Sequence, residues 1–149
     1  MLRLDAINME DLTTALEYRF TDYEAFWWID PETGVIDMWS RGTEAEDGLD
    51  KEGVDERGGI RIDPIESYEG YADMEDFIGG VEDPAARERL GRAINGSRPF
   101  RRFKDALWNF PDLEKEWYAF HDAVMTRRAI KWLTSWKLVD EADAALAQL

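Results

Sequence analysis

The chain of 149 residues has a formal net charge of −15, contains 44% hydrophobic and 13% aromatic residues, and has no cysteine. This length and composition indicate a folded chain with a hydrophobic core and exclude a disordered protein. Without cysteine, and with only one histidine, the chain cannot form disulfides, use a thiol nucleophile or build the common zinc sites. The N-terminus has no apolar segment like that of a signal peptide, and no run approaches 18 apolar residues. We therefore expect a cytoplasmic protein that does not span a membrane.

The charge is divided unevenly along the chain. Residues 1–82 contain 23 acidic and 6 basic residues, whereas residues 87–104 contain seven basic residues and one acidic residue. The acidic part should repel nucleic acid and anionic membranes at long range and favour basic partners, unless it serves only as a solvated surface.

The N-terminal half is predicted to contain one helix and three strands. Asn8 is a good N-cap for a helix that carries an apolar stripe to about Tyr18. Residues 23–29 and 35–39 are rich in aromatic and β-branched residues and flank the turn Asp30-Pro31-Glu32-Thr33-Gly34, which predicts a hairpin. Residues 60–63 alternate and should add a third strand.

Between the second and third strands we expect a flexible acidic loop over about residues 41–59. This stretch contains five glycines and almost nothing apolar. Because Trp27 and Trp28 point to opposite faces of their strand, both faces of the sheet need cover.

The remaining chain is predicted to be helical. Tyr71 begins an apolar pattern at helical spacing that ends near Gly79-Gly80. Asp83-Pro84 is an N-cap followed by proline at the first helical position, which starts the next helix, and Asn95-Gly96 stops it. A further helix is predicted from about Pro99 to Trp108.

A long last helix begins at Pro111-Asp112 and runs to about Trp136, and it carries two apolar stripes. The stripes consist of Leu113, Trp117, Phe120 and Val124, and of Tyr118, Met125, Ala129, Trp132 and Trp136. Either the helix is central and covered on two sides, which we favour, or its packing partner changes along its length. A short tail over residues 140–149 forms a last helical turn or frays.

These elements predict one α+β domain over residues 1–149. A small antiparallel sheet of about three strands should pack against four or five helices, with the long C-terminal helix central.

Several segments in series carry a resemblance to a known family. They are Ser67-Tyr68-Glu69-Gly70-Tyr71, residues 73–78, residues 87–94, Phe100-Arg101-Arg102-Phe103-Lys104-Asp105, Trp117-Tyr118-Ala119-Phe120 and residues 129–133. In order and spacing the chain resembles the bacterial uncharacterised protein family (UPF) 0158, most strongly over residues 60–133. The resemblance implies a bacterial, cytoplasmic, single-domain protein and supplies no catalytic residue, cofactor or substrate.

The basic segment over residues 87–104 is the first candidate binding surface. Arg98, Arg101, Arg102 and Lys104 could bind phosphate while an aromatic ring stacks on a base. We favour the alternative that Phe100, Phe103 and Leu107 belong to the core and the arginines pair with the protein's own 33 acidic residues.

Three further groups of residues are weaker candidates. Asp73, Glu75 and Asp76 could hold Mg²⁺ or Ca²⁺, although acids are also common near the start of a helix. Trp117, His121 and Arg128 share one side of the long helix, where His121 is the only side chain expected to titrate near neutrality, but a packed histidine is more often structural. Trp27, Trp28 and Trp39 could form a ligand-binding face, although a two-sided core is favoured.

The sequence therefore favours a non-catalytic interaction or regulatory protein with no cofactor, and another protein is its expected partner. The first alternative is a nucleic-acid-binding protein that uses residues 87–104. The second is an enzyme with an acid-based site formed by Asp73, Glu75, Asp76 and His121.

Overall fold

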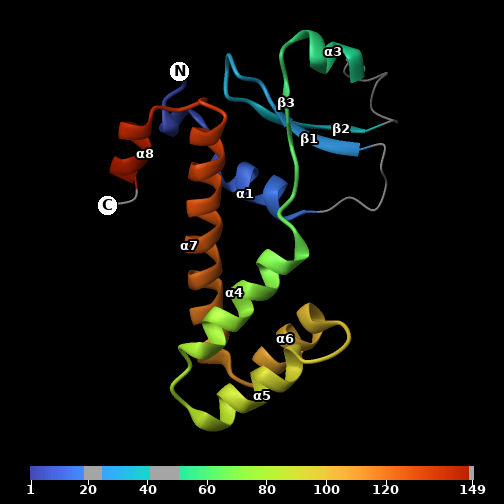
Figure 1. The fold of residues 1–149 in the computed structure, drawn as a ribbon, viewed down its shortest axis with the longest axis vertical. Helices are drawn as coiled ribbons and strands as arrows, with labels where there is room; N and C mark the ends of the chain where they lie inside the picture. The colour runs from blue at the N-terminus through green and yellow to red at the C-terminus, as the bar shows by residue number, and fades with distance from the viewer. Residues whose placement is uncertain (19–24, 41–50, 148–149) are drawn as a thin grey trace. The chain divides into compact units, whose positions relative to one another are not determined.

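The computed structural model describes residues 1–18, 25–40 and 51–147 (Figure 1). The chain divides into two compact units, which we call the sheet unit (residues 1–64 and 125–149) and the helical unit (residues 65–124). The predicted α+β class is confirmed, because helices accompany a three-stranded antiparallel sheet. No helix of the described residues is long and apolar enough to cross a membrane.

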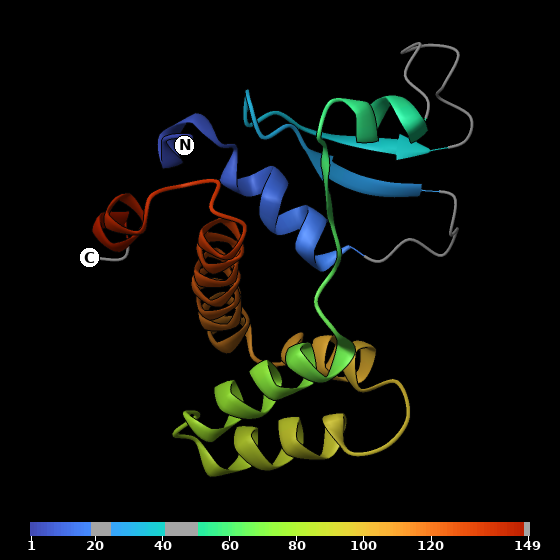
Figure 2. The ribbon, with the colours of Figure 1, turned by 45° about the horizontal axis from the view of Figure 1, so that its top comes forward.

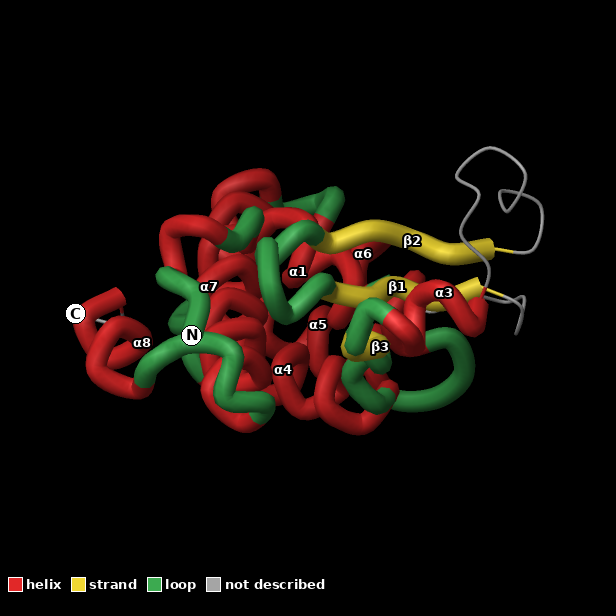
Figure 3. Tube along the Cα trace, turned by 90° about the horizontal axis from the view of Figure 1, so that it is seen from above, coloured by secondary structure: helices red, strands yellow, loops and turns green. Residues whose placement is uncertain are grey.

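The sheet consists of β1 (Ala25–Ile29), β2 (Ile36–Ser40) and β3 (Ile60–Ile62), in the order β2-β1-β3 (Figure 3). Both pairings are antiparallel, and the third strand adds to the hairpin as predicted. The predicted turn is confirmed: Gly34 has a φ of 80°, and its backbone N–H donates to the Asp30 carbonyl at 2.8 Å. Residues 23 and 24, predicted as the start of the first strand, lie outside the described residues.

One face of the sheet is covered by a helix that the sequence analysis did not predict. Trp28 and Trp39, each 5% exposed, cluster with Val54 of α3 (Lys51–Glu56). Phe26 adds to this face by stacking on Trp39 at 5.3 Å between ring centroids. The two tryptophans are core residues of this face, and Ile29 and Ile62, at 0% and 2% exposure, are buried on the opposite face. The prediction of a loop is wrong for residues 51–56, and residues 41–50 lie outside the described residues.

Helix α3 ends in a Schellman motif. Gly58 has a φ of 72°, its N–H donates to the Asp55 carbonyl at 3.0 Å, and the Gly59 N–H donates to the Val54 carbonyl at 2.9 Å. These two bonds satisfy carbonyls at the end of a short helix. The same glycines that suggested a flexible loop therefore terminate a helix.

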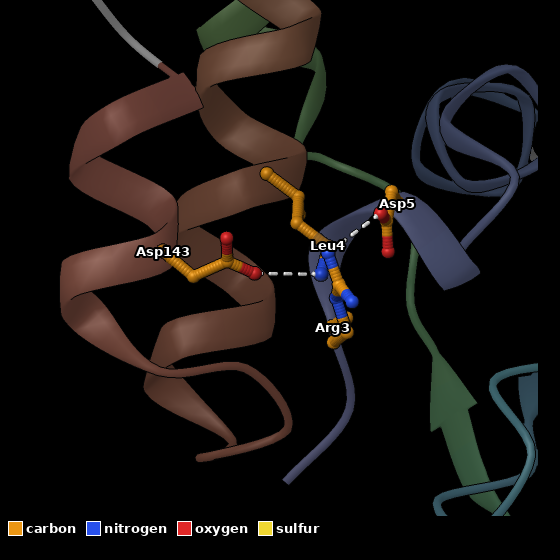
Figure 4. A network of polar contacts seen from close by, with 4 residues as sticks. All are labelled: Arg3, Leu4, Asp5 and Asp143. Carbon is orange, nitrogen blue, oxygen red and sulfur yellow. Dashed lines mark hydrogen bonds and ion pairs between the residues drawn. The ribbon is translucent and has the colours of Figure 1, made fainter.

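The two ends of the chain meet in the sheet unit. A 3₁₀ turn (Leu4–Ala6) precedes α1 (Met9–Glu17), and Asn8 caps α1 as predicted by accepting from the Asp11 N–H at 3.0 Å. Leu2 forms a parallel bridge with Val139. Figure 4 shows the carboxylate of Asp143, in α8 (Glu141–Ala147), accepting from the Leu4 backbone N–H at 2.7 Å.

The helical unit consists of α4 (Ser67–Gly79), α5 (Pro84–Ile94), α6 (Pro99–Leu107) and the first part of α7 (Pro111–Ser135), and Figure 2 shows the hairpin of α5 and α6. Asp83 caps α5 by accepting from the Ala85 N–H at 3.2 Å, with Pro84 at the first position, as predicted. The core includes an aromatic group in which Phe103 meets Trp117 edge to face at 4.8 Å and Phe77 at 6.3 Å. These helices therefore bury their apolar sides in a core of their own.

The two stripes of α7 reflect a change of packing partner. Trp117 belongs to the core of the helical unit, whereas Met125 and Ala129, at 2% and 0% exposure, belong to the sheet unit. The first part of the helix thus contributes to one core and the later part to the other. Tyr118 and Trp136, which we assigned to the second stripe, are 53% and 52% exposed.

Candidate functional site

The hairpin of α5 and α6 places a row of cationic side chains on the surface of the helical unit. Each helix buries its small and apolar residues: Ala86, Leu90, Ala93 and Ile94 on α5, and Phe103, Ala106 and Leu107 on α6. Because an α-helix has 3.6 residues per turn, the residues between these positions must face outward. Arg98, Arg101, Arg102 and Lys104 are all exposed, as are Arg89 and Arg92 on α5.

Some of these cations have partners within the helical unit. Arg92 pairs with Glu88 one turn earlier, and the Arg102 Nη1 donates to the Asn95 carbonyl at 3.2 Å. Arg87 donates from both Nε and Nη2 to the Val81 carbonyl, at 2.8 and 2.6 Å. Arg87, at the start of the basic segment over residues 87–104, therefore holds the α4–α5 connection.

Other cations make no ion pair within residues 1–18, 25–40 and 51–147. Arg98, Arg101 and Lys104 form no salt bridge with a carboxylate of this part of the chain. We expected the arginines to pair with the protein's own acids, and among the described residues only Arg92 of this group does so. The cationic groups of residues 98, 101 and 104 are therefore open to solvent.

One side of α6 combines two of these cations with an exposed tryptophan. Arg101, Lys104 and Trp108 are spaced by three and four residues, which places them on one side of the helix. Trp108 follows the last residue of α6 and is 79% exposed. We call these three residues the outer α6 face.

Phe100 lies apart from the core, contrary to the prediction. Its side chain is 43% exposed, whereas Phe103 and Leu107 are 1% and 2% exposed. A Cβ at Gly70 of α4 would lie 3.1 Å from Cε1 of Phe100, so the ring rests against the backbone of that glycine. Ala106, which we did not assign to the core, is buried beside Phe103 and Leu107 on this helix.

Two hollows of opposite charge lie on the helical unit. The first, of about 400 Å³, lies between α5 and α6 and is lined by Arg89, Arg92, Ala93, Arg102, Asp105, Ala106 and Asn109. The second, of about 710 Å³, is lined by Gly80, Val81, Glu82, Asp83, Asn109, Phe110, Pro111, Asp112, Leu113 and Glu116. We call them the arginine groove and the acidic hollow. Asn109 lines both, so the two hollows are neighbours.

The candidates on the long helix take separate roles. Trp117 is 7% exposed and belongs to the core, while the His121 ring is half-buried and stacks on Trp117 at 5.3 Å between centroids. Arg128 belongs to the sheet unit, where its Nη1 lies 3.6 Å from the Met125 Sδ. Trp117 and His121 are thus a packed pair, and neither lines a hollow described above.

The candidate carboxylates do not share a surface. Asp73 is 5% exposed and lies on the buried side of α4, whereas Glu75 and Asp76 are exposed. Across the described residues, no group of three acidic, histidine or cysteine side chains is placed to hold a metal ion. Neither hollow is lined by Asp73, Glu75, Asp76 or His121.

Sequence reasoning did not identify the acidic hollow or the arginine groove. The groove needs Arg89 and Arg92, one turn apart on α5, to meet Arg102 of α6, and the sequence does not specify how two helices meet. The acidic hollow is lined by acidic residues near the starts of α5 and α7. Acidic residues are common at helix N-termini because they interact favourably with the helix dipole, so their presence there did not indicate a site.

Comparison with known proteins places the chain in a family. The model of the uncharacterised protein family UPF0158 matches residues 6–147. A UPF0158 protein of Pseudomonas aeruginosa is 33% identical over 74 residues, which are 50% of this chain and 48% of the relative. The matched region thus spans about half the length of this curated relative. No solved structure matches the chain.

Proposed function

The chain belongs to the uncharacterised protein family UPF0158, and from the surface of its helical unit we propose that it is a non-catalytic interaction protein. The outer α6 face binds an acidic surface of another protein. The observation that supports this proposal is the exposed combination of Arg101, Lys104 and Trp108, whose cations make no salt bridge with the described residues.

Charge selects the kind of partner. The chain as a whole carries −15, so an acidic protein is repelled by most of its surface and attracted only where cations gather. Charge complementarity at such a patch guides encounter and disfavours wrong orientations. The outer α6 face would therefore fix both the place and the direction of binding.

Trp108 would supply most of the binding energy. A tryptophan that is 79% exposed gains little for folding, while burial at an interface removes a large apolar surface from water. Tryptophan and arginine are the residues most enriched among those whose truncation weakens protein complexes by 2 kcal/mol or more. Arg101 and Lys104 flank this anchor, which matches an apolar centre with a charged rim.

A nucleic acid is the second candidate partner, and the same face motivates it. Single-stranded nucleic acids bind where cations follow the phosphates and an aromatic ring stacks on a base. The acidic remainder of the chain opposes this reading at long range, which is why an acidic protein is preferred.

Quantitative affinity capture from an extract of the source bacterium tests the proposal. The baits are the wild type, Arg101→Glu with Lys104→Glu, and the control Arg127→Glu with Lys131→Glu. The control makes the same charge change at exposed positions of α7. We expect the wild type and the control to capture a set of acidic proteins that the outer-face variant does not capture. With a purified partner, Trp108→Ala should weaken the Kd by about 30-fold or more.

Fluorescence anisotropy with a labelled single-stranded RNA and DNA decides between the two partners. We expect binding no tighter than the non-specific range of roughly 10⁻⁴ to 10⁻⁶ M at physiological salt, and no difference between the outer-face and control variants. Tighter binding that only the outer-face variant loses would establish the nucleic-acid reading. Equal capture of every protein by all three baits would refute the role of this face.

A further inference from the structure

The arginine groove and the acidic hollow form an adjacent pair of oppositely charged depressions. Asn109 lines both, so they border each other across this residue. Three arginines line the groove, and four acids line the hollow: Glu82, Asp83, Asp112 and Glu116. The surface of the helical unit therefore has a positively charged depression directly beside a negatively charged one.

Much of this charge is left unpaired by the fold. Arg89, Glu82 and Glu116 are exposed and form no salt bridge within the described part of the chain. Among the residues that the structure describes, Arg92 forms a salt bridge only with Glu88, and that pair lies at the surface. These groups are available to a partner.

We propose that this surface is an isologous interface between two copies of the chain. A twofold axis close to Asn109 would place the arginine groove of each copy on the acidic hollow of the other. In a twofold interface every contact occurs twice, so a surface that carries neighbouring patches of opposite sign is complementary to itself. This interface uses residues outside the outer α6 face, so the inference goes beyond the proposed function.

The opposite charges of the groove and the hollow favour a second copy of the chain over other occupants. An acidic partner would fit the groove and be repelled by the adjoining hollow, and a basic partner would meet the reverse. A copy of the chain satisfies both at once. Each copy carries −15 in total, but at physiological ionic strength the Debye length is about 8 Å, so this repulsion is screened while close pairs persist.

Sedimentation equilibrium of the full chain at 0.15 M NaCl tests the proposal through two complementary variants. The groove variant is Arg89→Glu with Arg92→Glu, and the hollow variant is Glu82→Arg with Glu116→Arg. Alone, each variant would oppose like charges and should be monomeric. Mixed in equal amounts, the groove variant's acids face the hollow variant's arginines, and the two unchanged patches face each other.

We expect a wild-type dimer, two monomeric variants and a heterodimer in the mixture. The controls Arg101→Glu with Lys104→Glu, and Glu75→Arg with Asp76→Arg, make the same charge changes elsewhere on the helical unit and should leave the dimer within threefold of the wild-type Kd. Circular dichroism confirms that each variant is folded. Where a charge reversal prevents folding, Arg89→Gln with Arg92→Gln should weaken the dimer at least tenfold.

Three results would overturn the proposal. They are a monomeric wild type at 200 μM, controls that dissociate as readily as the groove variant, and a mixture of folded variants that stays monomeric. The control Arg101→Glu with Lys104→Glu is also the outer-face variant of the proposed function. A dimer that this variant retains while it loses its acidic partner would show that the two surfaces act separately.

Discussion

Replacing Gly59 by alanine tests the packing of α3, the helix found where the sequence predicted a loop, against Trp28 of β1. An added Cβ would lie 2.7 Å from the Val54 Cγ1, 2.8 Å from the Trp28 Cε3 and 2.9 Å from the Val54 carbonyl oxygen. Contacts under 3.0 Å force atoms to move, and the carbonyl oxygen moves only if α3 itself shifts away from β1. Crowding of this kind in a packed core costs about 1–3 kcal/mol.

The expected effect is a lower melting temperature. For a chain of this size about 1 kcal/mol corresponds to a shift of roughly 2–4 °C, so Gly59→Ala should melt roughly 2–12 °C below the wild type. Differential scanning calorimetry measures the shift, and near-ultraviolet circular dichroism reports on the packing around Trp28.

Gly91→Ala is the matched control. Gly91 lies within α5, and an added Cβ would meet nothing within 4 Å. Alanine in a helix interior is favoured over glycine by about 1 kcal/mol, so this variant should melt above the wild type. A Gly59→Ala protein that melts at or above the wild type would refute the packing of Val54 on Trp28.

Three further changes should affect stability by other routes. Phe103→Ala removes a side chain that is 1% exposed and contacts Phe77 and Trp117. Urea unfolding should therefore show that the free energy of unfolding falls by about 3–5 kcal/mol. A fall of less than about 1 kcal/mol would mean that this aromatic core is not formed. Arg87→Ala removes both hydrogen bonds to the Val81 carbonyl and should cost about 1–2 kcal/mol by the same assay, whereas Arg89→Ala, at an exposed neighbouring position, should cost little. Asn8→Ala removes the cap of α1 and should cost about 1 kcal/mol in thermal unfolding, while Asn8→Asp keeps an acceptor and should stay close to the wild type.

Local signals in the sequence predicted the elements that depend on local chemistry. Asn8 and Asp83 cap their helices, because a short polar side chain at that position satisfies a backbone N–H regardless of what packs nearby. Gly34 closes the hairpin because its φ of 80° suits glycine. These features need no knowledge of distant residues.

Features that depend on distant residues could not be predicted. Among residues 53–56 of α3, whose burial the structure describes, only Val54 is buried, and its burial depends on Trp28, which is 26 positions earlier in the chain. Phe100 was expected in the core of the helical unit and is 43% exposed, whereas Ala106 is buried, and the sequence of α6 alone does not tell how the neighbouring helices lie against it. The two stripes of α7 were visible in the sequence, but a pattern does not identify the partners that cover it.

The candidate surface was predicted in part. The cations and aromatic residues of residues 98–108 indicated a surface, and the solvent exposure of Arg101, Lys104 and Trp108 fits that reading. The number of acidic residues in the chain did not predict which arginines form salt bridges, because a salt bridge requires a carboxylate within reach and not merely an excess of carboxylates. Position in the fold, rather than total charge, decided which arginines stayed open.

The discontinuity of the sheet unit bears on how the chain folds during its synthesis. The helical unit is one uninterrupted segment, complete once Val124 has left the ribosome, whereas the sheet unit waits for residues 125–149. Leu2 cannot meet Val139 before residue 139 has been translated. Because loop-closure entropy grows with the length of the flexible loop, a helical unit that has already folded shortens the loop that this last contact must close. Folding of the helical unit during synthesis would therefore lower the entropic cost of the contact between Leu2 and Val139.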